Sequence, residues 1–424
     1  ATHCSHTVHR RGQVARGGSG ERRPENRMSS NLSFRVPPTE QPRLAAQHRV
    51  AIVTGSYDQS IDGVALTLNR LAARLLQLGH SVLVLCPGDV ARPPVLEHAG
   101  LLVRVPSTPL PVWSEYRLTW GLGGTARAAL EQFRPTVLHV AVPDAMGVAA
   151  QRWAARRRTP LLCSHHTRWA SYLDYYPPLR PFASLAWLHL RRFHARCAAT
   201  LPPSQGAANE LAARGIPRLV VWPRGVDVAL FSPSKRRAAA GSVPTVLLVA
   251  RLRWEKGLAD FAAVVRRLEA RAGRGAAFRT EVVGDGPARR RLEQLLPRAS
   301  FRGLLTGEAL AAAYAGADVF LYPSTTEGWG GTCLEAQASG LPVVATDSPG
   351  VADVISAGAS GLLAPPGDVG AMAAHVAALL ANRSLRVAMG RAAAAHASTF
   401  SWEASGDLVL AQYDGMASRV GRGV

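Results

Sequence analysis

Short apolar runs alternate with helix-patterned segments along most of this chain, and the alternation occurs twice. In the first half, the runs at 50–54, 81–85, 136–140 and 159–163 are rich in Val, Leu and Ile, as buried strands are. Between the first two runs, leucines recur at near-helical spacing up to Gly79, which predicts a helix with a glycine cap. Strands separated by helices of this length predict a parallel, doubly wound sheet.

A second series of the same kind begins at 245–250 and continues through three further runs, at 280–283, 319–322 and 343–346. The 424 residues suffice for two domains, each with its own core. We therefore predict an α/β architecture of two Rossmann-like, doubly wound parallel-sheet domains that face a central cleft. The expected domains are residues 49–222 and 245–402, joined by a linker at 223–244 that contains Pro, Ser, Lys and Arg.

Residues 1–48 differ from the rest of the chain. They are rich in Arg and Ser, poor in acidic residues and without sustained apolar periodicity, which predicts a disordered or targeting-like extension. This composition resembles an organellar transit peptide, so a plastid is one expected location beside a cytoplasmic or membrane-peripheral one, and Met28 is an alternative start. The five scattered cysteines form no C-x-x-C pair and indicate a reduced compartment.

The net charge of +20 raises the question of a nucleic-acid partner. We expect none, because the cations are spread along the chain and no basic region carries the interleaved aromatic residues of a nucleic-acid module. A basic surface also suits anionic nucleotides and anionic membranes. The sequence contains no uninterrupted run of about 18 apolar residues, so no transmembrane helix is expected.

Two cations stand where the first strand of the second domain ends. Arg251 directly follows that strand, and Lys256 lies five residues later in a chain whose only other lysine is Lys235. Fixed cations at such a position can bind a diphosphate and stabilise its developing charge, and two solvated loop cations are the alternative. The chain has no Asp-x-Asp pair, the usual metal–diphosphate motif, so we expect neither a metal nor another cofactor.

The segment 323–335 follows a predicted strand and contains several glycines, which permit close approach of the backbone to a ligand. A helix that opens near Gly331 or Thr332 would present free N–H groups to a phosphate. Glu335, placed in the first turn of that helix, could accept hydrogen bonds from ribose hydroxyls, and Glu327 could contact the sugar. A capping carboxylate and a surface carboxylate are the alternatives for these two residues.

Glu327 and Glu335, with seven residues between them, resemble the E-x7-E motif of retaining glycosyltransferases, and the whole chain resembles glycosyltransferase family 4 over about residues 49–415. The resemblance implies the GT-B architecture, in which the final segment, here 403–424, packs back on the N-terminal acceptor domain. Further matching motifs are Asp62-Gly63-Val64, Ser164-His165-His166-Thr167, Trp222-Pro223-Arg224-Gly225-Val226-Asp227, Arg251 with Glu255-Lys256-Gly257, Val283-Gly284-Asp285-Gly286-Pro287 and the run from Leu334 to Ala345.

The resemblance implies a role for each matching residue. Arg251 and Lys256 would bind the donor's diphosphate as the leaving group, and Gly63 would let the first loop approach the phosphates. Glu335 would hold the ribose, whereas Glu327 and His166 would lie at the sugar, with His165 as the rival of His166. The candidate catalytic residues are thus His166, Arg251, Lys256 and Glu327, and the candidate donor-binding residues are Gly63, Arg251, Lys256, Glu327, Gly330, Gly331, Thr332 and Glu335.

One departure from the family pattern follows Glu327. Family members usually carry Phe-Gly two residues after the first Glu, whereas this chain has Gly328-Trp329-Gly330. The bulkier Trp329 is expected to reshape the sugar pocket.

The resemblance implies a retaining, metal-independent transferase that moves a hexosyl group (sulfoquinovose, mannose or glucose) from a UDP- or GDP-linked donor to a lipid or glycan hydroxyl. The S-x-H-T and W-x-R-G-V-D elements resemble the branch of sulfolipid synthases and GDP-mannose-dependent mannosyltransferases. An inactive nucleotide-sugar-binding scaffold is the alternative. Residues 179–197 combine apolar residues with arginines, so a helix there would either contact an anionic membrane or pack between elements.

Overall fold

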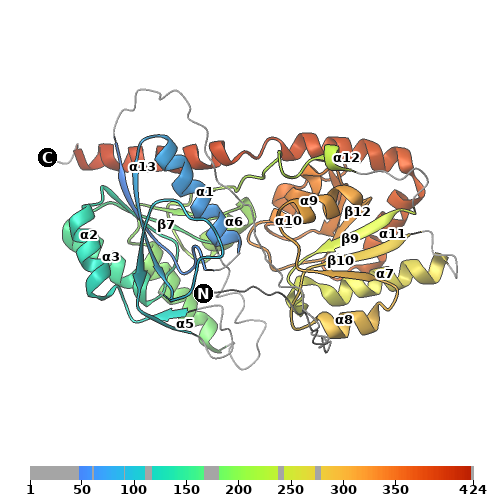
Figure 1. Ribbon diagram of the computed structural model, residues 1–424, viewed down its shortest axis with the longest axis horizontal. Helices are drawn as coiled ribbons and strands as arrows, with labels where there is room; N and C mark the ends of the chain where they lie inside the picture. The colour runs from blue at the N-terminus through green and yellow to red at the C-terminus, as the bar shows by residue number, and fades with distance from the viewer. Residues whose placement is uncertain are drawn as a thin grey trace, which may run out of the picture.

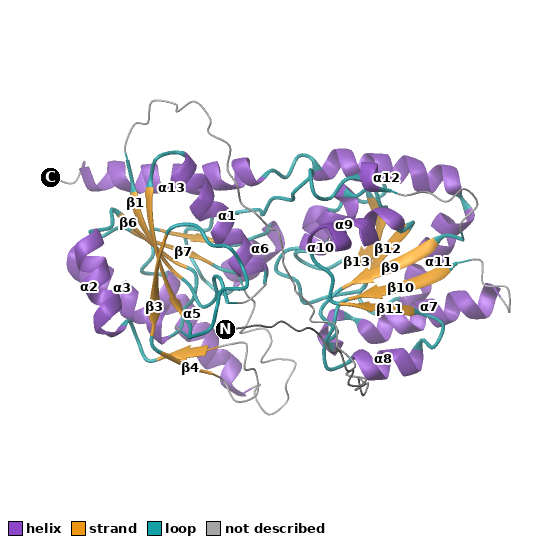
Figure 2. Ribbon diagram, in the orientation of Figure 1, coloured by secondary structure: helices purple, strands orange, loops and turns teal. Residues whose placement is uncertain are grey.

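The computed structural model describes residues 47–59, 62–89, 91–109, 117–166, 181–236, 243–272 and 278–421. Within these ranges the chain forms two lobes, each built around a six-stranded parallel sheet flanked by helices (Figures 1 and 2). Residues 1–46 of the extension expected at 1–48 lie outside the described residues. His48, which we assigned to that extension, is buried and its Nε2 lies 2.7 Å from Oδ1 of Asp414, so the packed part of the chain begins before Arg49.

The first sheet has the order β3-β2-β1-β6-β7-β8. Asp62 caps the first helix by accepting hydrogen bonds from the backbone N–H groups of Val64 and Ala65, and Gly79 follows the helix at φ 82°, as the sequence predicted. The elements of this lobe are β1 (Arg49–Val53), α1 (Gly63–Gln77), β2 (Ser81–Pro87), β3 (Leu101–Val105), the antiparallel pair β4 (Ser107–Pro109) and β5 (Arg117–Thr119), α2 (Gly123–Phe133), β6 (Val137–Val140), α3 (Ala145–Arg157), β7 (Leu161–Ser164), α5 (Ala183–His194), β8 (Ala199–Leu201) and α6 (Gln205–Ala213).

The second sheet repeats this order as β11-β10-β9-β12-β13-β14. In both sheets the strand order reverses next to the first strand, between β1 and β6 and between β9 and β12, and such a switch point is where doubly wound sheets bind ligands. The second lobe contains β9 (Thr245–Val249), α7 (Leu258–Ala272), β10 (Arg279–Val283), α8 (Arg289–Leu295), β11 (Ser300–Gly303), α9 (Gly307–Gly316), β12 (Val319–Tyr322), α10 (Gly331–Ala338), β13 (Val343–Thr346), β14 (Gly361–Ala364), α11 (Val369–Ala381) and α12 (Arg383–Ala397).

The chain crosses between the lobes twice, and the two crossings touch. The backbone N–H of Val226 donates to the carbonyl of Phe400 at 3.0 Å. A Cβ on Gly225 would lie 2.4 Å from the backbone nitrogen of Trp402, so only glycine fits between the crossings. Because Val226 and Phe231 are buried in the core of the second lobe, residues 226–231 belong to that lobe, and the linker that we expected at 223–244 is shorter there.

After the second crossing, α13 (Trp402–Gly421) runs back along the first lobe beside α1 (Figure 1). Val409, Tyr413 and Met416 enter the same hydrophobic cluster as the strands of the first sheet. Arg74 of α1 donates two hydrogen bonds, of 2.8 and 3.0 Å, to Asp407. The first lobe is therefore completed by the last described helix of the chain.

Helix α5 corresponds to the expected amphipathic segment. Trp187, Leu190 and Phe193 are buried, whereas Phe182 and Leu185 are more than half exposed. Packing within the lobe accounts for the inner face, and contact of the outer face with a membrane stays a prediction. None of the described helices combines the length and the hydrophobicity that crossing a bilayer requires.

Candidate active site

Lys256 and Glu327 form a buried ion pair at the switch point of the second sheet. Nζ of Lys256 lies 2.6 Å from Oε1 of Glu327, and the hydroxyls of Tyr322 and Ser324 donate to the same oxygen at 2.7 and 3.0 Å. Burial alone would raise the pKa of the Glu327 carboxyl, but Lys256 and the two hydroxyls bring it below the ordinary value. We call these four residues the Glu327 cluster. The cluster keeps the Glu327 carboxylate ionised just beyond the end of β12.

Glu335 lies on α10, but in the second turn of the helix rather than the first, because the helix begins at Gly331 and its first turn contains no acidic residue. The hydroxyl of Tyr314 donates to Oε2 of Glu335 at 3.0 Å. Burial raises the pKa of the Glu335 carboxyl to about 7, against the opposing effect of that hydrogen bond. Glu335 therefore changes its protonation state close to neutral pH, whereas Glu327 remains ionised.

Arg224 lies where the two lobes meet. From the sequence, Arg224 was assigned no role within the W-x-R-G-V-D motif. A Cβ on Gly63 would lie 2.7 Å from Nη1 of Arg224, and Nη2 of Arg224 lies 3.4 Å from Nδ1 of His166. Burial lowers the pKa of Arg224 to about 10, with Asp62 and Glu327 acting in the opposite direction through their charges. The buried Nε of Arg224 has no hydrogen-bond partner among the described residues. The sequence signal for Arg224 was its place in the W-x-R-G-V-D motif.

His166 also touches the loop of the second lobe. A Cβ on Gly328 would lie 3.4 Å from the carbonyl oxygen of His166, so the loop that carries Glu327 packs against residue 166. The structure thus brings together four of the predicted site residues, namely Gly63, His166, Lys256 and Glu327. His165 is buried against His194, with ring centroids 5.8 Å apart, and so occupies the interior of the first lobe.

The remaining predicted residues lie around the start of α10 and the end of β9. Gly330 is the N-cap of α10, and a Cβ on Gly330 would lie 2.7 Å from the side chain of Val354. Gly331 is the first residue of the helix, and the side chain of Thr332 lies near Tyr322 of the Glu327 cluster. Arg251 is exposed and lies two residues after the end of β9. All four therefore border the switch point.

The expectation that Trp329 reshapes the sugar pocket is not supported. The Trp329 side chain is only 7% exposed and belongs to the core of the second lobe, where its ring lies 5.7 Å from that of Phe400. Burial of this large apolar ring against Phe400 is more favourable than its exposure to water. The tryptophan therefore joins the core to the inter-lobe crossing.

One group of His, Cys, Asp or Glu side chains within the described ranges could hold a metal ion. It consists of Cys163, His194 and Cys197, all buried, with ligand atoms within 4.8 Å of one another. These residues belong to the end of β7 and to α5 and the turn after it, and none of them is part of the Glu327 cluster. The four described cysteines are free.

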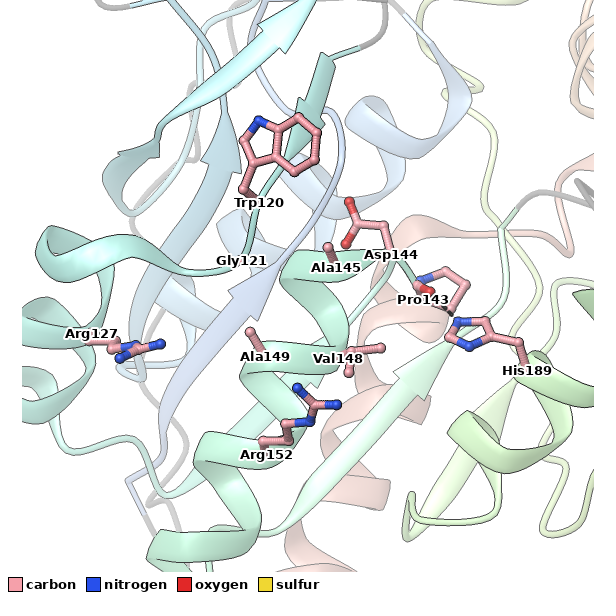
Figure 3. Close-up of a pocket in the computed structure, with 10 residues that line it drawn as sticks. All are labelled: Trp120, Gly121, Arg127, Pro143, Asp144, Ala145, Val148, Ala149, Arg152 and His189. Atoms are coloured by element: carbon pink, nitrogen blue, oxygen red, sulfur yellow. Dashed lines mark hydrogen bonds between the residues drawn. The ribbon is translucent and has the colours of Figure 1, made fainter.

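A hollow of about 460 Å³ opens at the carboxyl end of β6 in the first lobe (Figure 3). Figure 3 shows Trp120 above the first turn of α3, with Arg152 further along that helix and Arg127 on the other side of the hollow. The indole is 84% exposed, which is unusual for Trp. His189 is held at the rim by a 2.7 Å hydrogen bond to the carbonyl of Pro143. An aromatic surface beside two arginines suits a polar or anionic ligand with a flat face.

The chain matches known protein families along most of its length. Residues 61–230 match the family model described as Glycosyltransferase Family 4, and residues 243–382 match the one described as Glycosyl transferases group 1. A GDP-mannose-dependent alpha-mannosyltransferase of Mycolicibacterium smegmatis is 34% identical over 385 residues, covering 88% of this chain and 98% of that protein. The chain belongs to glycosyltransferase family 4.

A further relative supports this family, and two solved structures support the fold. Sulfoquinovosyl transferase SQD2 of Arabidopsis thaliana is 30% identical over 383 residues, covering 85% of this chain and 72% of that protein. The solved sucrose-phosphate synthase of Thermosynechococcus elongatus superposes with a TM-score of 0.73 at 20% identity, over 87% of this chain and 99% of that one. Anabaena HepE in complex with UDP and glucose superposes with a TM-score of 0.67 at 19% identity, over 86% and 99% of the two chains. The predicted GT-B fold and glycosyltransferase family are confirmed.

Proposed function

We propose that this family 4 glycosyltransferase transfers mannose from GDP-mannose to a lipid or glycan hydroxyl, with retention of the anomeric configuration and without a metal. The observation that carries the proposal is the buried Lys256–Glu327 pair beside Arg224, at the point where the two lobes meet. The choice of mannose is supported by three relatives named GDP-mannose-dependent alpha-mannosyltransferase, which are 33–34% identical to this chain.

In the proposed reaction the donor's diphosphate lies between the end of β9 and the start of α10. Lys256, Arg251 and Arg224 supply positive charge that becomes most valuable as the phosphate departs, and the free N–H groups at the start of α10 add to it. The bond between the anomeric carbon and the phosphate oxygen breaks, the acceptor oxygen bonds to that carbon, and the proton of the acceptor hydroxyl passes to the departing phosphate. Glu327 is the anion beside the sugar, and Glu335 accepts hydrogen bonds from the ribose.

The acceptor is proposed to enter from the first lobe. The hollow beside Trp120 supports this assignment because an exposed indole can stack on a sugar ring while Arg127 and Arg152 attract negative charge. On this proposal, Trp120→Ala raises the KM for the acceptor about tenfold and leaves the KM for the donor unchanged.

Product analysis tests the reaction. The purified protein is incubated with GDP-mannose, UDP-glucose or UDP-sulfoquinovose and a lipid extract, with and without EDTA. An α-linked mannosyl product that forms equally in EDTA supports the proposal, whereas a β-linked product contradicts retention and loss of activity in EDTA contradicts metal independence. Tight binding of GDP without transfer to any acceptor would favour the inactive scaffold.

A further inference from the structure

A continuous series of hydrogen bonds runs from the last helix to the cleft. The hydroxyl of Tyr413 on α13 lies 2.7 Å from Nδ1 of His139, and Nε2 of His139 lies 2.9 Å from Oγ of Ser164. The same Oγ lies 2.8 Å from Nε2 of His166. Tyr413, His139 and Ser164 are at most 2% exposed, so water cannot replace these partners. We call these four residues the Tyr413–His166 chain.

Both histidines in this chain are neutral. Burial lowers the pKa of His139 to about 3. Burial, together with the charge of Arg224, holds the pKa of His166 well below its ordinary value. A neutral imidazole has one nitrogen that donates and one that accepts. Each ring can therefore take only one of two tautomers, and the tautomer of one ring restricts that of the other through Ser164.

Arg224 favours one direction of the chain, and Tyr413 supplies the acceptor that completes it at the other end. A guanidinium can only donate, so Nδ1 of His166, 3.4 Å from Nη2 of Arg224, accepts, but a bond of this length is too weak to hold one tautomer by itself. The proton of His166 then sits on Nε2 and is donated to Ser164, whose hydroxyl donates to Nε2 of His139. His139 in turn carries its proton on Nδ1 and donates it to the oxygen of Tyr413. In this arrangement each ring nitrogen of the two histidines has a partner.

We propose that Tyr413 is a positioning residue for glycosyl transfer, which acts through His139 and Ser164 to hold His166 in a single tautomer and orientation at the cleft. The consequence reaches Glu327 because the carbonyl oxygen of His166 packs against Gly328, the residue after Glu327. Docking of α13 on the first lobe is thereby linked to the loop that carries Glu327 in the second. The inference rests on the proposed function for its catalytic consequence, but not for the tautomer itself.

Tyr413→Phe removes the hydroxyl oxygen and little else. We expect kcat to fall about five- to tenfold while the KM for the donor changes less than about twofold, because a buried donor on His139 is left without an acceptor. The matched control is Tyr57→Phe. Tyr57 is equally buried in the same lobe, and its hydroxyl donates to the carbonyl of Ala99 at 2.6 Å, outside the chain. Equal effects of the two variants on kcat would overturn the proposal.

Ser164→Ala separates action through the chain from a general loss of packing. If Tyr413 acts through Ser164, adding Tyr413→Phe to Ser164→Ala should lower kcat no further, whereas independent effects would multiply. Additive losses in this double-mutant cycle would contradict the chain.

The tautomer is measured without any substrate. In nitrogen-15 NMR of histidine-labelled protein, His166 should show a protonated Nε2 and an unprotonated Nδ1 in the wild type, and a mixture of tautomers in Tyr413→Phe. A mixture already present in the wild type would overturn the inference, even if transfer from GDP-mannose is demonstrated. Conversely, if the expected single tautomer is found but no transfer occurs, the proposed function is refuted and the Tyr413–His166 chain of hydrogen bonds is still supported.

Discussion

At the scale of single residues, the cations of the cleft differ in what they stabilise. Lys256 is almost fully buried and neutralises Glu327, whereas Arg251 is exposed. Removing Lys256 therefore leaves a buried carboxylate without its counter-ion, a change that costs several kcal/mol of folding free energy in other proteins. Removing Arg251, an exposed group, leaves no buried charge behind and should cost little folding free energy.

We predict that Arg251→Ala lowers kcat about a hundredfold and the free energy of unfolding by less than about 1 kcal/mol, whereas Lys256→Ala lowers kcat and lowers the free energy of unfolding by about 3 kcal/mol. The matched control is Lys235→Ala, because the only other lysine forms an exposed pair with Glu308. Steady-state kinetics and urea unfolding measure the two quantities. A stable, active Lys256→Ala protein would show that the ion pair has neither function.

Glu335 allows a prediction about pH. Its pKa in the folded protein, about 7, lies above the ordinary value of 4.5, so between these values the folded state binds more protons than the unfolded state. The contribution of Glu335 to the free energy of unfolding has its full value at pH below the pKa of the unfolded state. This contribution is lost as the pH rises through the pKa of the folded state. Glu335→Gln should therefore raise the free energy of unfolding by about 2 kcal/mol near pH 8 and by little near pH 5.

The same substitution should weaken the binding of GDP about tenfold, because a neutral amide is a poorer acceptor for two ribose hydroxyls. Urea unfolding at the two pH values and titration calorimetry with GDP measure these opposite effects. Equal stabilisation at both pH values would contradict the raised pKa. Unchanged affinity for GDP would contradict the ribose contact.

At the scale of elements, the two crossings between the lobes depend on one glycine. Gly225→Ala should destabilise the protein by about 3 kcal/mol, since the new methyl group would lie 2.4 Å from the backbone of Trp402, which cannot rotate away. The control is Gly316→Ala at the end of α9, where nothing lies within 4 Å of the added carbon. Thermal unfolding compares the two, and similar melting temperatures would show that the crossings are not tightly packed.

Most elements of the two sheets were predictable from local sequence. All eight predicted strands lie within two residues of observed ones, because each is a short apolar run that the sheet buries on both faces. Edge strands were missed. β3 is mostly half-buried and ends Val-Arg-Val, and β11 reads Ser-Phe-Arg-Gly, in which exposed and half-buried residues alternate. At an edge one face is solvated, so the continuous apolar signal is absent.

At the scale of the whole molecule, Asp353 ties the lobes together. Its carboxylate accepts hydrogen bonds from the backbone N–H groups of Gln205 and Gly206, at the start of α6 in the first lobe, and from Gly350 in its own. Charge-assisted bonds at a helix N-terminus contribute about 1–2 kcal/mol. This contact favours the arrangement in which the lobes are close.

We predict that Asp353→Ala shifts the balance between open and closed lobes about tenfold toward the open form. Small-angle scattering should show a larger radius of gyration than for the wild type, and saturating GDP should reverse the change. Asp368→Ala, which removes only the cap of α11 within the second lobe, is the control. An unchanged radius of gyration in Asp353→Ala would show that other contacts hold the lobes together.

The sequence by itself determined what depends on neighbours along the chain. Apolar periodicity predicted the two Rossmann-like units, because strand ends and helix starts are local features. The donor position indicated by the motifs around Arg251, Lys256, Glu327 and Glu335 stays a prediction. The helix expected to open near Gly331 or Thr332 begins at Gly331.

Only the tertiary structure decided what depends on residues far apart in the chain. It set Arg224 beside Gly63, His166 and Glu327, turned Trp329 into the core, and joined Tyr413 to His139 across 274 positions. It also raised the pKa of Glu335, since burial is a property of the packed molecule. Sequence patterns record the preferences of single elements, whereas contacts, charges and protonation at a cleft depend on how two lobes pack against each other.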